Sequence, residues 1–82
     1  MSKILLPWKC LGGIVWQRCT ITGEVVGEVG VSRYHRYSFH VNSTVPSLMG
    51  SSSTLEEGKS TVDSHLARFG FRFISEKESV ML

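Results

Sequence analysis

The stretch from Ser53 to Gly70 constrains the fold most, because it carries the start, the apolar stripe and the end of one amphipathic helix. Ser53 or Thr54 can accept a backbone N–H at the helix start, and in either register a glutamate follows three residues on, as in a capping box. Gly70 stands where a glycine often ends a helix in the left-handed conformation. We therefore predict a helix over residues 54–69.

Apolar positions within this stretch recur at spacings of three and four, which predicts that one face of the helix is buried. The members of this stripe are Leu55, Gly58, Val62, Leu66 and Phe69. Glycine in a helix interior costs roughly 1 kcal/mol relative to alanine. Gly58 therefore has two interpretations: the helix packs closely on a sheet at this point, or the position tolerates a weak helix former.

Before the helix, three runs of strand-like residues are separated by short turns, which predicts an antiparallel meander. The run 14–21 is rich in β-branched and aromatic residues, but which of its faces is buried stays open. One face carries Val15, Cys19 and Ile21, and the other carries Ile14, Trp16, Arg18 and Thr20. The run 24–31 predicts an inward face of Val25, Gly27, Val29 and Val31, and the run 35–41 places Tyr37, Phe39 and Val41 together.

The chain of 82 residues is expected to form a single α+β domain. We predict a three- to four-stranded antiparallel β-meander packed against one C-terminal α-helix. The meander takes residues 14–42, a serine-rich loop takes 43–53, and a tail takes 75–82. Short strands are also indicated at 3–6 and just after the helix, although the partner of the first cannot be read from the sequence.

Both ends of the chain carry apolar residues that the expected meander does not use. These are Ile4, Leu5 and Leu6 near the start, and Val80, Met81 and Leu82 at the end. A domain of this size gains a modest core from one helix and a few strands. We therefore predict a homodimer that forms through a sheet edge or the apolar tail; the alternative is that the two ends pair within one monomer.

Charge and hydropathy narrow the setting in which the chain works. The net charge of +2 is too small to argue for nucleic acid by itself, and no run is long and apolar enough for a membrane span or a signal peptide. We expect no membrane association and a cytoplasmic location, which is the host cytoplasm if the chain is encoded by a phage. Cys10 and Cys19 are then expected to be reduced thiols.

No spacing typical of a catalytic or metal site occurs in the sequence. The cysteines and histidines do not fall at the paired intervals of zinc sites. No serine lies in a nucleophile elbow, and no glycines form a phosphate-binding loop. The sequence therefore predicts a protein that is not an enzyme and that holds no metal and no cofactor.

Over residues 16–69 the burial pattern resembles that of a known group of proteins. The residues that carry the resemblance are Trp16, Val25, Val29, Tyr37, Phe39, Val41 and the helix pattern from Ser53 to Leu66. The chain looks like small phage and prophage β-β-β-α proteins and, more distantly, like the arm-type DNA-binding domain of phage tyrosine integrases. In the integrase domains the open sheet face enters the DNA groove, and Arg18, Arg36, Ser38 and His40 would match that face. Glu24 and Glu28 would share it and repel phosphates.

These features predict a small, non-enzymatic, phage-type accessory protein that binds a host protein or a second copy of itself. Inhibition of a host or defence protein is one outcome of such binding, and the alternative is DNA binding through the open sheet face. A mixed-charge surface with exposed aromatic residues suits a protein better than a polyanion. The expected partner-binding residues are Trp16, Arg18, Val26, Arg33, Tyr34, Arg36 and His40.

Overall fold

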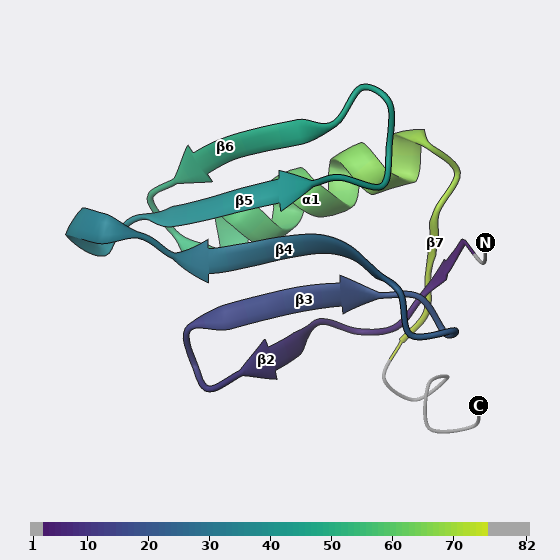
Figure 1. The fold of residues 1–82 in the computed structure, drawn as a ribbon, viewed down its shortest axis with the longest axis horizontal. Helices are drawn as coiled ribbons and strands as arrows, with labels where there is room; N and C mark the ends of the chain where they lie inside the picture. Colours follow the sequence, from purple (N-terminus) through teal and green to yellow (C-terminus); the bar gives the residue numbers. More distant parts are fainter. Residues whose placement is uncertain (1–2, 76–82) are drawn as a thin grey trace.

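The computed structural model describes residues 3–75, apart from the His35 side chain. Its main sheet carries a helix on one face, and a short two-stranded pair forms a second, smaller sheet (Figure 1). The elements, in chain order, are β1 (Ile4–Leu5), β2 (Lys9–Leu11), β3 (Val15–Cys19), β4 (Val25–Val31), the 3-10 turn η1 (Arg33–His35), β5 (Tyr37–Val41), β6 (Leu48–Ser52), α1 (Leu55–Arg68) and β7 (Arg72–Phe73).

The main sheet has five antiparallel strands in the order β2-β3-β4-β5-β6, so that each strand pairs with the next one in the chain. The helix α1 contacts β4, β5 and β6 (Figure 1). The predicted α+β class, with an antiparallel meander on one C-terminal helix, is confirmed. The sheet extends beyond the predicted three to four strands, because β2 and β6 add a strand at each edge.

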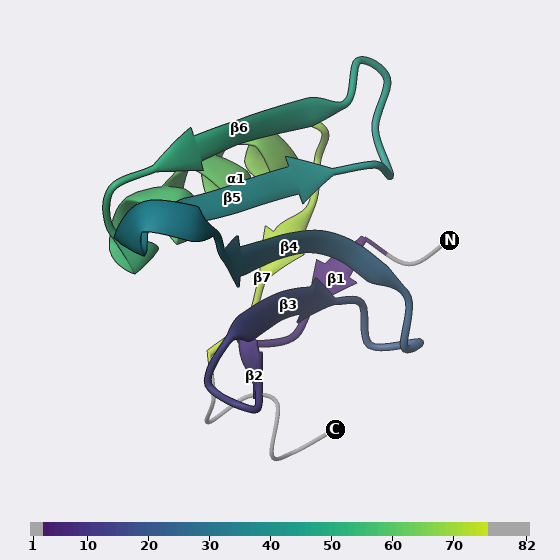
Figure 2. The same cartoon turned by 60° about the vertical axis from the view of Figure 1, so that its left-hand side comes forward.

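The hydrophobic core lies between the sheet and α1, and β1 and β7 close it at one end (Figure 2). Its buried apolar residues are Leu5, Val26, Val29, Phe39, Val41, Val62, Leu66, Phe71 and Ile74. The short strands β1 and β7 form a separate parallel pair. The strand β1, whose partner the sequence did not reveal, therefore pairs with β7, which follows the helix. The apolar residues 80–82, through which dimerisation was also predicted, lie outside the described residues.

The start of α1 settles which residue caps it. The Oγ1 atom of Thr54 accepts the backbone N–H of Glu57 at 3.2 Å, so Thr54 rather than Ser53 is the N-cap. The Ser53 hydroxyl instead donates to the Glu57 carboxylate at 3.4 Å. The hydrogen bond to Thr54 fixes where the helix begins. It also satisfies one of the backbone N–H groups that the first turn of a helix leaves without a partner.

The end of α1 is closed by the predicted glycine. Gly70 has φ of 83°, and the N–H of Phe71 donates to the carbonyl of Leu66 at 3.2 Å, which is the pattern of a Schellman motif. The ammonium of Lys3 donates to the carbonyl of Phe69 at 2.7 Å, so the N-terminal segment also caps the helix. The observed helix therefore ends within one residue of the predicted boundary.

Gly58 marks a close approach of α1 to the sheet, as the first of its two interpretations requires. A Cβ atom at this position would lie 2.9 Å from the Ser52 Oγ and 3.2 Å from a methyl group of Val29. Both neighbours are buried, and the Ser52 hydroxyl is held by a hydrogen bond to the carbonyl of Thr54. The missing side chain lets the helix approach the strands at this point.

We expect Gly58→Ala to destabilise the domain although alanine is the better helix former. The gain in helix propensity is about 1 kcal/mol, whereas crowding a packed interior costs typically 1–3 kcal/mol. Urea unfolding of the variant measures the balance, with Ser64→Ala on the exposed side of the same helix as the matched control. A Gly58→Ala variant more stable than the native chain would contradict close packing.

The serine-rich segment 43–53 differs from the prediction, because residues 48–52 form the edge strand β6. Serine and glycine have low intrinsic preference for strands, so the sequence alone favours a loop here. Pairing with β5 overrides that preference: Gly50 lies opposite Phe39, and a Cβ atom on Gly50 would be 2.7 Å from the Phe39 ring. The predicted loop is therefore wrong for this part of the segment.

The strand alternation predicted for residues 24–31 is interrupted by a register shift. Arg18 pairs with Gly27, but Cys19 pairs with Val25, so Val26 is the extra residue of a bulge. Val26, which was expected to be exposed, is 3% exposed, whereas Val25 is half exposed. The prediction of an inward face holds for Gly27 and Val29 and fails at the two ends of the strand.

Candidate functional site

The structure distributes the seven predicted partner-binding residues over different environments instead of one patch. Arg18 and Val26 are buried, and Trp16 and His40 are half-buried. Only Arg33, Tyr34 and Arg36, which surround the turn between β4 and β5, are exposed. These environments lie on two sides of the sheet: the helix side, which faces α1, and the opposite side, the open face.

Arg18 lies on the helix side of the sheet and is held by Asp63 of α1. Its Nε and Nη2 atoms donate to the two carboxylate oxygens of Asp63 at 3.0 and 3.2 Å, and its Nη1 donates to the carbonyl of Leu6 at 2.6 Å. The Arg18 side chain is 9% exposed. The expectation that Arg18 belongs to the open face is therefore wrong, because its charge is neutralised inside the fold.

Aromatic rings enclose this ion pair. The Arg18 guanidinium carbon lies 5.4 Å from the centre of the Trp8 ring and 4.7 Å from that of Phe73, within the range of cation–π attraction. The indole N–H of Trp8 donates to Asp63 at 3.2 Å. We call these four residues the Arg18 cluster; it joins the N-terminal segment, β3, α1 and β7.

A second cation extends the row of rings along the surface. The Lys59 ammonium lies 5.9 Å from the centre of the Trp8 ring and 6.0 Å from that of Trp16. Trp16 in turn meets Tyr37 edge to face, with centroids 6.1 Å apart. All four side chains are half-buried. We call Trp8, Lys59, Trp16 and Tyr37 the aromatic strip.

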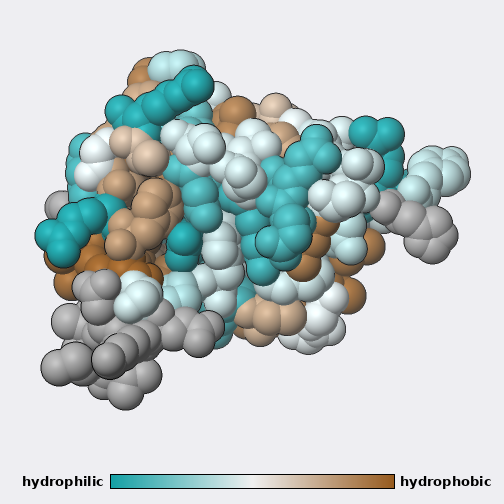
Figure 3. All heavy atoms as spheres, turned by 180° about the vertical axis from the view of Figure 1, so that it is seen from behind, coloured by the Kyte–Doolittle hydropathy of each residue, from teal (hydrophilic) through white to brown (hydrophobic). Residues whose placement is uncertain are grey.

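The strip remains open to solvent because α1 contacts β4, β5 and β6 and leaves the helix side of β2 and β3 less covered. Beside it lie Val31, which pairs with Tyr37 and is 50% exposed, and Ile14, which is 61% exposed. Figure 3 views this side and shows hydrophobic surface in brown next to teal polar side chains. The strip therefore continues into apolar surface at one end of the molecule.

The turn between β4 and β5 extends that same end. Tyr34 is 87% exposed and has φ of 62° and ψ of 34°, the left-handed region that residues other than glycine rarely adopt. Arg33 and Arg36 flank it and are exposed. Strain of this kind often accompanies functional positions. The aromatic strip and the turn together form the candidate site.

The open face of the sheet is different in character. One row across the strands runs Lys9, Gln17, Glu28, His40 and Met49. The amide of Gln17 donates to the Glu28 carboxylate at 3.0 Å. Glu28 lies on this face as expected, and its charge opposes that of Lys9, so this row does not form a basic surface.

Sequence reasoning missed four residues around the site: Trp8, Tyr37, Lys59 and Asp63. Trp8 lies in an irregular segment after a proline, where no periodicity assigns it to a face. Lys59 and Asp63 do not belong to the predicted apolar stripe, but their i,i+4 spacing places them together on one face of α1. That spacing was the available signal, because such a charged pair can reach a common neighbouring element.

The described residues, 3–75, were also compared with the requirements of metal sites, disulfides and membrane spans. No three histidine, cysteine, aspartate or glutamate side chains of this part lie close enough together to hold a metal ion. Cys10 and Cys19 are both free thiols. None of the described helices has the length and hydropathy needed to cross a membrane.

Comparisons with models of protein families, with curated proteins and with solved structures each returned no match.

Proposed function

We propose that this chain acts without catalysis, by binding a protein partner through the aromatic strip and the β4–β5 turn. The observation that carries the proposal is the concentration of tyrosine, tryptophan and arginine at one end of the helix side. These residue types dominate the energy of protein interfaces, where aromatic rings fill pockets and arginines pair with acidic groups. Tyr34 in particular extends its ring into solvent.

DNA binding through the open face, the alternative predicted from the resemblance, has weaker support. DNA affinity depends on cations that neutralise phosphates. Arg18, which was expected to contribute one of these cations, is paired with Asp63 on the other side of the sheet, and the open face carries Glu28. A protein partner with an acidic rim fits the exposed Arg33 and Arg36 without requiring a continuous basic surface.

A phage-type accessory role, in the host cytoplasm and with inhibition of a host or defence protein as its outcome, is part of the same proposal. It rests on the resemblance of residues 16–69 to small phage proteins. A binding surface on a domain of 82 residues is sufficient for such a role, because blocking a partner requires contact and no chemistry.

The proposal predicts that Tyr34→Asn weakens partner binding by about 30-fold, or about 2 kcal/mol, the size of an interface hot spot. Asparagine tolerates the left-handed conformation, so the turn keeps its shape. The measurement is retention of host-lysate proteins by the immobilised native chain, followed by titration of the retained protein against each variant. Arg36→Ala should weaken binding in the same direction.

Val45→Ala is the matched control, because Val45 is 93% exposed and lies in the loop between β5 and β6. Its affinity should equal that of the native chain. Equal affinity of the Tyr34→Asn variant would contradict the proposed surface. Gel mobility with duplex DNA over a range of salt tests the alternative, and tight, salt-dependent binding that His40→Ala removes would favour the open face instead.

A further inference from the structure

The strand β6 is an edge without the features that usually protect edges. Among the described residues no strand pairs with its outer side, and its sequence, Leu-Met-Gly-Ser-Ser, contains no charge and no proline. Natural edge strands are typically short, charged, bulged or covered, because exposed backbone groups invite another strand. The other edge, β2, follows that rule, since it has three residues and begins with Lys9.

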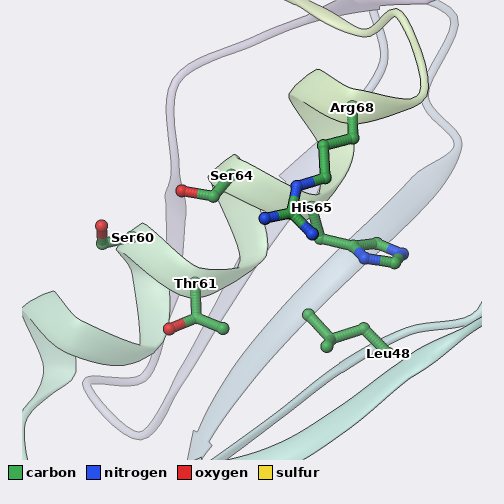
Figure 4. Close-up of a pocket in the computed structure, with 6 residues that line it drawn as sticks. All are labelled: Leu48, Ser60, Thr61, Ser64, His65 and Arg68. Carbon is green, nitrogen blue, oxygen red and sulfur yellow. The ribbon is translucent and has the colours of Figure 1, made fainter.

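The space beside β6 is open on both faces of the sheet. On the helix side, a groove of about 250 Å³ lies between Leu48 of β6 and the second half of α1, and Figure 4 shows Thr61 and His65 of α1 on the side toward Leu48. On the open face, Met49 is 83% exposed and Ser51 is also exposed. No side chain of β6 is charged, and its two large side chains, Leu48 and Met49, stand on the faces of the sheet and not in the plane of its edge, where a strand would pair.

A second copy of the chain suits this edge, because β6 is compatible with itself. In an antiparallel two-fold pairing the strand meets its own sequence, so a charge on it would face a like charge. With five uncharged residues that repulsion is absent. Met49 of one copy would lie next to Met49 or Ser51 of the other, which removes apolar surface from water.

We propose that two copies of this chain pair antiparallel through β6, so that the two five-stranded sheets join into one. This inference goes beyond the proposed function and rests on the edge strand alone; of the candidate-site residues, Tyr37 pairs with β6, at Ser52, and the others lie outside β6. The dimer leaves one candidate site on each copy. Two sites on one particle raise the apparent affinity for a partner that is itself repeated.

The test is the mass in solution of the full chain and of a Met49→Lys, Ser51→Lys double variant. The native chain should run at twice the monomer mass of 9.2 kDa by light scattering at high micromolar concentration. The double variant should run at the monomer mass, because lysines at both outward positions of β6 bring like charges together in the paired edge. In the double variant, amide hydrogen exchange in residues 48–52 should be faster than in the native chain, because the outer edge of β6 is then no longer paired.

Leu11→Lys adds a charge to the opposite edge strand and is the matched control; it should remain dimeric. A native chain that is monomeric at this concentration overturns the inference. A dimer that survives the double variant but dissociates with Leu11→Lys, or on removal of residues 79–82, assigns the interface elsewhere and also overturns it. Circular dichroism confirms that each variant is folded, so loss of the dimer is not mistaken for unfolding.

Discussion

Val62→Asp and Leu66→Asp are each expected to unfold the domain. Both residues lie on the buried face of α1 and are 0% exposed, and a methyl group of Val62 lies close to Gly27 of β4. Among the described residues the buried cation on this side of the sheet, Arg18, is already paired with Asp63, so a new aspartate would be an unpaired charge, which costs several kcal/mol or forces the core open. A domain of 82 residues has a total stability of about 4–12 kcal/mol.

Far-ultraviolet circular dichroism and thermal melting measure this effect directly. Ser60→Asp supplies the matched control. Ser60 is exposed on the same helix, so the carboxylate of the introduced aspartate remains in water. The control should melt within a few degrees of the native chain. If both core variants melted cooperatively near the native temperature, the sheet-facing side of α1 would have to be reassigned.

The helix could be predicted in detail because its signals are local. The cap, the acidic first turn, the apolar stripe and Gly70 lie within eighteen consecutive residues and all indicate one element. Even the glycine on the stripe was informative, since one of its two interpretations was close packing on a sheet, and an added Cβ at Gly58 would meet Ser52 and Val29. The β-meander was recognisable for the same reason, from short turns between alternating runs.

The missed features depend on contacts between residues far apart in the chain. The edge strand β6 exists because its serines and glycine pair with β5, not because they prefer strands. The bulge that buries Val26 changes the alternation of β4 and leaves no signature in composition. In the same way β1 finds its partner in β7, nearly seventy residues later.

The candidate site shows the same division between local and distant information. Arg33, Tyr34 and Arg36 were predicted as part of a mixed-charge surface, and the structure places them, exposed, in and beside the turn between β4 and β5. Arg18 was assigned to the open face because the resemblance to integrase domains implies basic residues there, and only the fold brings it to Asp63 across 45 residues. Trp8 and Lys59 become part of the aromatic strip through the same folding, which no periodicity describes.

Asp63→Ala is expected to destabilise the domain by about 3 kcal/mol, the lower end of the cost of breaking a buried ion pair. Removal of the carboxylate leaves the Arg18 guanidinium, with its side chain 9% exposed, without its counter-ion. The Trp8 indole N–H loses its acceptor as well. The lower end applies because the Asp63 side chain itself is 30% exposed, so water partly solvates the pair.

A double-mutant cycle separates the loss of an ion pair from loss of packing. Arg18→Met removes the charge and keeps most of the side-chain volume between the rings of Trp8 and Phe73. The Arg18→Met, Asp63→Ala double variant should therefore lose less stability than the sum of the two single losses, because with both charges removed neither is left unpaired. Urea unfolding followed by tryptophan fluorescence reports on the cluster itself, since Trp8 belongs to it. A negligible loss in Arg18→Met alone would instead mean that the cluster acts through packing, and the charge of Arg18 would then be incidental to the fold.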